Sequence, residues 1–345
     1  MLKKAVFLDI VNLSGTIMKA LVTGATGFIG SHVADLLHSR GIEVVCTIRQ
    51  TSNLRWLKDK PYKLVEASLS NKDSLIEAAK DVDYVVHVAG LTFARNYDEF
   101  LRGNQGGTRN LLEATSEAAP TLKRFLFVSS QTVAGPSESL DNPKTEIMED
   151  KPLTSYAKSK LAAEGEVWKM KDKMPITIVR PPAVYGPRDT AIFDIFKTVK
   201  MGLGTLIGFK PKYLSLIHST DLARGIVDAA MSKKTIGELY YVSSDEFYNW
   251  DQLMNLIAAG FGKKSVFKLK LPHPMVLSVA AISEFFGKFS SKPPVFNYEK
   301  GIDFIQDYWT CSTEKAKRDF GYSQQVSIED GLKETCQWYL EQKWL

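Results

Sequence analysis

Cysteine is scarce in this 345-residue sequence, which contains only Cys46, Cys311 and Cys336. The three residues are odd in number, far apart and without a Cys-x-x-Cys spacing, which argues against a disulfide framework and a cysteine zinc site. We therefore expect reduced thiols, a cytoplasmic location and no bound metal.

Long apolar runs are absent as well. No stretch reaches the roughly 18 to 20 apolar residues that a membrane-spanning helix needs. The closest candidate, residues 275–289, contains Ser278, Ser283, Glu284 and Lys288. The sequence therefore predicts no membrane span, and we expect this stretch to be a helix packed on the core.

The net charge is small, at +5, and the basic residues are scattered along the chain. A nucleic-acid surface needs a dense basic cluster instead. DNA and RNA are therefore excluded as main partners, and a small-molecule substrate is expected.

Residues 1–17 lack the full pattern of a signal peptide. Lys3 and Lys4 precede a short apolar run, but Asp9 and Asn12 interrupt it and no small-residue cleavage site follows. We expect this segment to be a non-functional extension.

Glycine is informative where it clusters. The apolar run of residues 20–23 breaks into Gly24, Gly27 and Gly30, and the chain then continues in helical period. Such glycines let a strand turn sharply into a helix whose N-terminus binds a pyrophosphate. An ordinary tight turn can share the pattern, but the Gly-x-x-Gly-x-x-Gly spacing favours a dinucleotide site. We assign to this site Gly24, Thr26, Gly27, Phe28, Ile29 and Gly30.

A carboxylate is missing where a dinucleotide enzyme reads the adenosine ribose. The second predicted strand, residues 43–48, ends at Ile48 and is followed by Arg49. NAD-specific sites place an acid there, whereas an arginine can bind a 2′-phosphate. The predicted cofactor is NADP or NAD, with NADP favoured; Arg49 as a solvated loop residue is the alternative.

Strand and helix patterns alternate through the next segments. Predicted strands at 63–67, 83–90 and 124–130 indicate parallel pairing through right-handed crossovers. Functional groups belong at the carboxyl ends of such strands, although we interpret His87 as a packed strand residue. Further cofactor contacts are predicted at these ends: Ser68, Leu69, Val88, Ala89, Gly90 and Val128.

Tyr156 and Lys160 lie four residues apart, on one face of a predicted helix. Lowering a tyrosine pKa from 10 by about 3 units requires roughly 4 kcal/mol. An ammonium about 4 Å away supplies energy of that order at an effective dielectric of 20. Ser130, at a neighbouring strand end, can hold the substrate oxygen. We predict these three residues as catalytic, with an ordinary helix surface and strand terminus as the alternative.

Together these motifs resemble an extended short-chain dehydrogenase/reductase of the NAD-dependent epimerase/dehydratase superfamily, in the dihydroflavonol reductase and 3β-hydroxysteroid dehydrogenase-like branch. The resemblance extends from Met18 to Leu345. It implies that Ser130 positions the substrate, that Tyr156 transfers a proton and that Lys160 binds the nicotinamide ribose.

The same resemblance completes the candidate site. Many members of the family carry an aspartate where this chain has Ser68, which leaves the adenine contact open. Further cofactor contacts are expected at Asn104, Pro181, Ala183 and Val184, and substrate contacts at Thr92, Gln131, Pro182 and Phe193.

The implied fold is α/β, a Rossmann-type doubly wound parallel sheet with a smaller C-terminal substrate-binding lobe. Residues 18–187 are expected to form mainly the NAD(P)-binding domain and residues 188–345 mainly the lobe, with 212–245 returning to the first domain. A homodimer through a helix pair that includes the Tyr156 helix is also implied.

Two features select among the reactions of such a fold. A dehydratase would usually carry acids after the catalytic hydroxyl, but Ser130 is followed by Gln131-Thr132-Val133. Arg188, Lys210 and Lys212 are candidates for binding a nucleotide-sugar diphosphate, but their surroundings between residues 192 and 209 are strongly apolar.

We therefore predict an NAD(P)-dependent oxidoreductase. It interconverts a secondary alcohol and a ketone on a small apolar or cyclic substrate by hydride transfer, with Tyr156 as proton donor or acceptor. The alternatives are a nucleotide-sugar 4-epimerase or dehydratase and a non-catalytic NAD(P)-sensing protein.

Overall fold

The computed structural model of the chain describes residues 17–287, 289 and 296–345. The predicted N-terminal extension therefore lies almost entirely outside the described residues. Among the described residues, no helix combines the length and the apolar content that crossing a bilayer requires.

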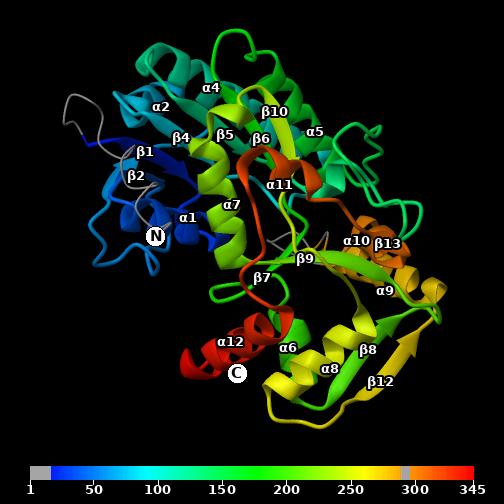
Figure 1. The fold of residues 1–345 in the computed structure, drawn as a ribbon. Helices are drawn as coiled ribbons and strands as arrows, with labels where there is room; N and C mark the ends of the chain where they lie inside the picture. Colours follow the sequence, from blue (N-terminus) through cyan, green and yellow to red (C-terminus); the bar gives the residue numbers. More distant parts are fainter. Residues whose placement is uncertain (1–16, 288, 290–295) are drawn as a thin grey trace.

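Seven parallel strands form the large sheet (Figure 1). Its inner strands are buried along their whole length, which explains their continuous apolar sequences. In spatial order the strands are β10 (Glu238–Tyr241), β6 (Ile176–Arg180), β5 (Arg124–Val128), β4 (Tyr84–His87), β1 (Lys19–Thr23), β2 (Glu43–Ile48) and β3 (Lys63–Glu66).

Helices cover both faces of this sheet, so the doubly wound α/β fold is confirmed. One face packs against α1 (Phe28–Ser39) and α7 (Ser219–Met231), which share one apolar core. The other face packs against α2 (Lys72–Ala79), α4 (Gly107–Ala118) and α5 (Ser155–Trp168). The strand order reverses between β1 and β4, and ligands bind at such a switch point beyond the carboxyl ends of the strands.

The C-terminal half builds a second, smaller assembly around a third apolar core. A four-stranded sheet contains β7 (Ala183–Tyr185), β9 (Tyr213–His218), β11 (Phe247–Asn249) and β13 (Tyr308–Trp309). β8 (Leu203–Ile207) pairs with β12 (Phe267–Leu271). The core is closed by α6 (Phe193–Lys200), α8 (Trp250–Gly260) and α12 (Ile328–Glu341).

Residues 212–245 contribute to both assemblies. Within this segment, β9 belongs to the four-stranded sheet, whereas α7 packs on the large sheet and β10 is its edge strand. The remaining elements of the described chain are α3 (Tyr97–Phe100), the π-helix η1 (Leu101–Gly106), the 3-10 helices η2 (Gln131–Val133) and η3 (Lys233–Thr235), α9 (His273–Gly287), α10 (Tyr298–Ile305) and α11 (Glu314–Phe320).

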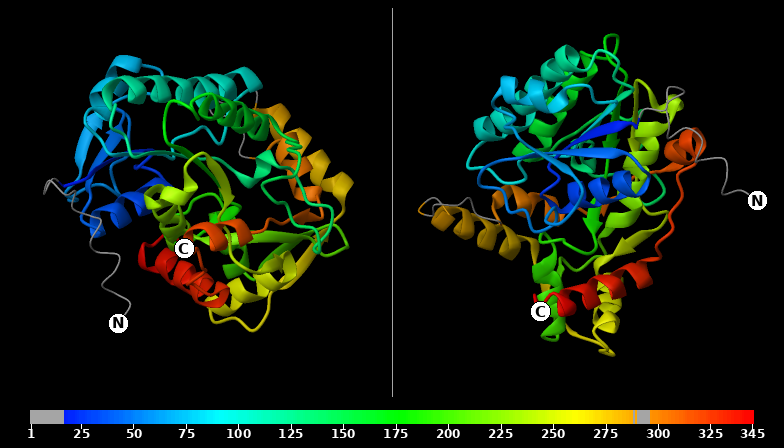
Figure 2. Two further views of the ribbon diagram at one scale, coloured as in Figure 1. Left: turned by 45° about the horizontal axis from the view of Figure 1, so that its top comes forward. Right: turned by 90° about the vertical axis from the view of Figure 1, so that its left-hand side faces the viewer.

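The apolar helix predicted over 275–289 corresponds to α9, but the expectation that it packs on the core is wrong. Only Val276 and Ala280 of this helix are buried. The right-hand view of Figure 2 shows α9, in gold, extending from the body of the molecule. The helix is apolar almost all round and packs along one narrow edge, so most of its side chains stay exposed.

Candidate active site

The first glycine turn has the geometry of a phosphate cradle. Gly24 adopts φ +75°, and a Cβ added to it would lie 2.7 Å from the main-chain nitrogen of Ala89. A Cβ on Gly30 would lie 2.2 Å from the carbonyl oxygen of Gly24. Only glycine fits at these two positions, which bring β1, α1 and the end of β4 into close contact.

The N-terminus of α1 is available to an anion. Gly27 is its N-cap residue, and no side chain caps the helix. The first main-chain N–H groups of α1 are therefore left to bind phosphate at the positive end of the helix dipole. Both observations fit a dinucleotide, whose pyrophosphate Gly27, Phe28 and Ile29 would hold.

Ser130 and Tyr156 are brought together from distant parts of the chain. Ser130 follows β5 and caps η2, and its hydroxyl accepts hydrogen bonds from the Thr132 hydroxyl at 2.9 Å and main-chain N–H at 3.3 Å. Tyr156 is the second residue of α5, and its phenol lies close enough to the Ser130 side chain for Ser130 to lower its pKa. The two predicted proton-handling groups therefore meet at the carboxyl end of β5.

Lys160 lies one turn further along α5 and is buried. Its Nζ atom donates to the carbonyl oxygen of Val128 at 2.8 Å and lies 4.1 Å from the centre of the Phe127 ring. Burial lowers the pKa of Lys160 to about 7, and the carboxylate of Glu164 acts in the opposite direction. The ammonium is thus held at the strand end where the predicted nicotinamide site begins.

The pKa of Tyr156 differs from the sequence-based expectation. Burial raises the pKa of the phenol, the hydrogen bond with Ser130 lowers it, and the nearby Asp303 carboxylate raises it further. The expected lowering by Lys160 is not seen; the Lys160 ammonium donates to the Val128 carbonyl instead.

Asn104 holds the loop after β4 against α5. Its Oδ1 atom accepts from the main-chain N–H of Leu91 at 2.7 Å, and its Nδ2 atom donates to the Ser159 hydroxyl at 2.9 Å. Asn104 lies in η1, and π-helical turns occur frequently at functional sites. This position supports a role in arranging Gly90 and Lys160, although no cofactor atom is needed to explain its bonds.

His87 is a packed strand residue, as predicted. Its ring nitrogens are hydrogen-bonded to the hydroxyls of Thr23 at 2.7 Å and Thr108 at 3.0 Å. Burial lowers the pKa of His87 to about 3. The imidazole is therefore neutral at physiological pH and links β1, β4 and α4.

The residues expected near the adenosine lie at the ends of β2 and β3. Arg49 is exposed, and its main-chain N–H donates to the Ser52 hydroxyl at 2.8 Å. Ser68 is half-buried, and its hydroxyl lies 2.9 Å from that of Ser70. Asn110 donates to the carbonyl oxygen of Leu69 at 2.8 Å, which ties this loop to α4. Nothing in these contacts blocks a role in binding the adenosine.

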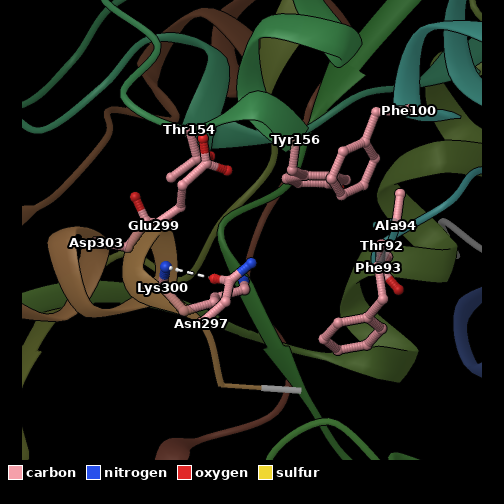
Figure 3. A pocket seen from close by; sticks show the side chains of 10 residues that line it. All are labelled: Thr92, Phe93, Ala94, Phe100, Thr154, Tyr156, Asn297, Glu299, Lys300 and Asp303. Atoms are coloured by element: carbon pink, nitrogen blue, oxygen red, sulfur yellow. Dashed lines mark hydrogen bonds between the residues drawn. The ribbon is translucent and has the colours of Figure 1, made fainter. Parts of the chain in front are cut away.

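A pocket opens beside Tyr156, and Figure 3 shows the side chains that line it. The Tyr156 ring packs edge-to-face against Phe100, with ring centres 6.0 Å apart. The lining comes from the loop after β4, from α3, from the start of α5 and from α10: Thr92, Phe93, Ala94, Phe100, Thr154, Tyr156, Asn297, Glu299, Lys300 and Asp303.

The contribution of α10 was not predicted. The main-chain N–H and hydroxyl of Ser155 donate to the Glu299 carboxylate at 2.9 and 2.7 Å, which fixes the start of α5. Asp303 is buried, its Oδ1 atom has no hydrogen-bond partner in the described part of the chain, and burial raises its pKa to about 6. The only sequence signal for this contribution was the short amphipathic stretch of residues 298–305, in which acidic and basic residues alternate. Such a stretch usually forms a solvated helix face.

The four predicted substrate residues lie in different surroundings. Thr92 lines the pocket. Gln131 is buried, and its Nε2 atom has no hydrogen-bond partner among the described residues. Pro182, two residues after the end of β6, is also buried. The position of Phe193 does not support the prediction, because its ring packs against Tyr339, with ring centres 5.1 Å apart, in the apolar core of the C-terminal assembly.

The remaining predicted cofactor positions, Pro181, Ala183 and Val184, follow β6. The carbonyl oxygen of Pro181 accepts from the main-chain N–H of Gln131 at 2.8 Å, and Ala183 is exposed. This segment joins the ends of β5 and β6 beside the candidate site.

The cradle for a dinucleotide and the Ser130, Tyr156 and Lys160 side chains define an NAD(P)-dependent enzyme of oxidoreductase or epimerase type. Residues 20–242 match the family model described as "NAD dependent epimerase/dehydratase family". The chain belongs to this family, which confirms the resemblance drawn from the sequence motifs.

Two relatives and one solved structure illustrate this membership. A ceramide reductase from Caulobacter vibrioides is 30% identical, over 94% of this chain and 95% of its own. A 2-alkyl-3-oxoalkanoate reductase from Shewanella oneidensis is 27% identical, over 93% of this chain and 86% of its own. The structure of UDP-glucuronic acid 4-epimerase from Bacillus cereus, with UDP-glucuronic acid and NAD, has a TM-score of 0.74 and 25% identity, over 94% of this chain and 100% of the other.

Proposed function

We propose that the protein interconverts a secondary alcohol and a ketone, with NAD(P) as cofactor and Tyr156 as the proton donor or acceptor. The observation that carries this proposal is that Tyr156 lines a pocket while its phenol lies close enough to the Ser130 side chain for Ser130 to lower its pKa. This geometry allows one substrate oxygen to contact both hydroxyl groups.

Each side chain has a distinct task in the direction of ketone reduction. A bound nicotinamide dinucleotide supplies the hydride. Ser130 donates a hydrogen bond to the ketone oxygen, and Tyr156 transfers its phenolic proton to that oxygen as the alcohol forms. The resulting phenolate regains a proton from solvent, and Lys160 would hold the nicotinamide ribose. In oxidation of the alcohol the same steps run in reverse.

The proposed substrate is a small apolar or cyclic molecule. The sequence argument for it relied on apolar residues between 192 and 209, but most of them form the core of the C-terminal assembly. Better support comes from Phe93, Ala94 and Phe100 in the pocket and from the names of two relatives, a ceramide reductase and a 2-alkyl-3-oxoalkanoate reductase.

A nucleotide-sugar 4-epimerase is the second candidate, favoured by the likeness to UDP-glucuronic acid 4-epimerase. Against it, two of the three cations considered for a diphosphate are engaged within the protein. Arg188 pairs with Asp35 at 2.7 Å, and Lys212 pairs with Asp307 at 2.7 Å. Stabilisation of the protein by UDP-sugars in a thermal-shift assay would favour the epimerase.

NADP is the proposed cofactor in preference to NAD. Arg49 follows β2 as an exposed cation, and no acid stands between Glu43 and Arg49 to accept hydrogen bonds from a ribose 2′-hydroxyl. We expect Arg49→Ala to weaken NADP binding about tenfold while leaving NAD binding unchanged. Isothermal titration with both cofactors measures this difference.

A homodimer through α5 and its neighbour α4 is part of the proposal. The partly exposed side of α5 carries Leu161, Ala162 and Gly165, and a Cβ added to Gly165 would meet nothing within 4 Å. Ala162 and Gly165 are small and allow a second helix to approach closely. Sedimentation velocity on the wild type and on Gly165→Arg tests this interface.

The cytoplasm is the proposed location, because Cys46, Cys311 and Cys336 are all buried and unpaired. Thiols persist in this form in reducing compartments. Fractionation of cells that produce the full chain tests the proposed location.

The function itself is tested with a panel of ketones and reduced nicotinamide cofactors. We expect oxidation of the reduced cofactor that depends on an apolar or cyclic ketone and is lost in Tyr156→Phe. Binding of the cofactor without turnover of any ketone or alcohol would contradict the proposal.

A further inference from the structure

The outward side of α9 is an apolar surface without charge. Phe286 is 66% exposed, and Phe289, just beyond the helix, is 78% exposed. Among the described exposed residues from 274 to 289, Ser278 is the only one with a polar side chain. The outward surface consists of Met275, Val279, Ile282, Phe285, Phe286 and Phe289.

The fold does not need this surface for its own packing. α9 contacts α10 along its opposite edge, where a Cβ added to Gly301 would lie 3.1 Å from the Cβ of Ala280. The Glu284 carboxylate accepts from the main-chain N–H of Tyr298 at 2.9 Å and secures the same edge. The rings of Phe285 and Phe289 contact one another outside this interface, with centres 5.6 Å apart.

The net positive charge of the chain is concentrated in the stretch of sequence that contains this helix. Residues 252–298 contain six lysines and Glu284 as their one acid, a balance that equals the net charge of +5 of the whole chain. The other residues therefore carry equal numbers of basic and acidic side chains. Lys268 and Lys270 precede α9 on β12, and Lys288 and Lys292 follow it in the sequence.

We propose that α9 docks the protein onto the surface of a bilayer that contains anionic phospholipids. An interfacial helix buries an apolar face at the boundary between headgroups and acyl chains, and flanking lysines bind the anionic headgroups. The Met275 to Phe289 surface supplies the first element, and the exposed Lys264 and Lys270 in the segment before α9 supply the second. A second copy of this chain is a poorer occupant, because it would bring the same positive charge against this surface.

The docking surface lies next to the candidate active site. α9 packs on α10, and α10 supplies Asn297, Glu299, Lys300 and Asp303 to the pocket beside Tyr156. The bilayer would therefore be a source of apolar substrate close to the pocket. This consequence rests on the proposed function, whereas the docking itself does not.

Flotation of the purified full chain with lipid vesicles tests the proposal. We expect binding to vesicles of phosphatidylcholine with phosphatidylglycerol, weaker binding to phosphatidylcholine alone, and release by high salt. Ile282→Ser with Phe286→Ser should reduce binding at least about tenfold. Ile147→Ser, at a position 95% exposed on a different loop, is the matched control and should bind as the wild type does.

A charge variant tests the second element separately. Lys264→Gln with Lys270→Gln, at two exposed positions, should weaken binding to phosphatidylglycerol vesicles and leave binding to phosphatidylcholine vesicles unchanged. The melting temperature of every variant should match that of the wild type, because all of these side chains are exposed.

Three outcomes would overturn the proposal: no flotation of the wild type, equal flotation of the Ile282→Ser/Phe286→Ser variant, or a wild-type dimer that this variant dissociates. The last outcome would assign the surface to a second copy. Turnover of a water-soluble ketone by the same variant should remain at the wild-type level, so a failure to bind vesicles is distinguishable from a failure of the proposed enzyme activity.

Discussion

The ammonium of Lys160 lies 2.8 Å from the carbonyl oxygen of Val128, at the end of a fully buried strand. Among the described residues, no carboxylate pairs with it; Glu164, one turn along α5, is bound to Arg180 instead. A buried cation of this kind lowers the stability of the folded protein. Such groups are found where the cation is needed for function.

The free energy of unfolding is therefore expected to rise with pH because of the buried Lys160. Burial lowers the pKa of Lys160 to about 7 in the folded protein from 10.5, so the unfolded chain binds more protons between these values. This contribution is complete above about pH 10 and is lost as the pH falls through 7, with a size on the order of 3–5 kcal/mol. Lys160→Met should flatten the rise in urea unfolding between pH 7 and 10. A wild-type stability that falls with pH in the same window would contradict this account.

Tyr156→Phe removes the proposed proton donor without changing the shape of the pocket. We expect turnover to fall by about 100-fold or more, because general acid catalysis contributes at least that factor. The affinity for reduced cofactor should stay within about twofold of wild type. Fluorescence titration measures the affinity for the reduced cofactor, and steady-state kinetics measures turnover. Tyr97→Phe, on the partly exposed α3, is the control and should change neither.

Asp303→Asn is expected to move the pH profile of the reaction. The carboxylate raises the pKa of Tyr156, so its removal should shift the limb of the kcat/KM profile assigned to the phenol toward lower pH. An unchanged limb would show that Asp303 has no electrostatic influence on the phenol during turnover.

The same substitution should affect stability. Burial raises the pKa of Asp303 to about 6 from 3.8, so the folded protein binds more protons between these values and loses stability as the pH rises through them. Asp303→Asn should therefore stabilise the protein at pH 7, by up to about 3 kcal/mol, and remove this pH dependence. Thermal unfolding at pH 4, 6 and 7 checks the direction.

The buried ion network behind the site is expected to be important for folding. Arg180 on β6 donates to Glu164 at 2.6 Å and to Asp150 at 2.6 Å, and its side chain is 4% exposed. Arg180→Leu leaves two carboxylates without a cation and should cost about 3–5 kcal/mol in denaturant unfolding. Arg188→Leu, which breaks the more exposed pair with Asp35, should cost about 1 kcal/mol or less and serves as the control.

Local patterns predicted the sheet and the glycine turn because each depends on residues close in sequence. The strand expected over 43–48 is β2, Glu43–Ile48, and the helix expected from Ser155 is α5. Ser130 could be placed in the site from sequence because it follows the carboxyl end of β5, where the fold brings functional groups together. Tyr156 stands at the start of α5 and was joined to it by the spacing to Lys160 and by the family resemblance.

The parts that were missed depend on packing between distant segments. The role of α10 could not be predicted, because Glu299 and Asp303 gain their surroundings only from the start of α5. Phe193 was expected in the site but packs on Tyr339, a residue 146 positions later, in an apolar core. An apolar side chain gives no local sign of whether it faces a ligand or a neighbouring helix.

The transfer of deuterium from a reduced cofactor labelled on the nicotinamide ring tests the central claim most directly. With a ketone that the wild type turns over, we expect the label on the carbinol carbon of the product alcohol and no transfer in Tyr156→Phe. An epimerised product that carries no label, or transfer that continues at the wild-type rate in Tyr156→Phe, would contradict an alcohol and ketone oxidoreductase that uses this phenol.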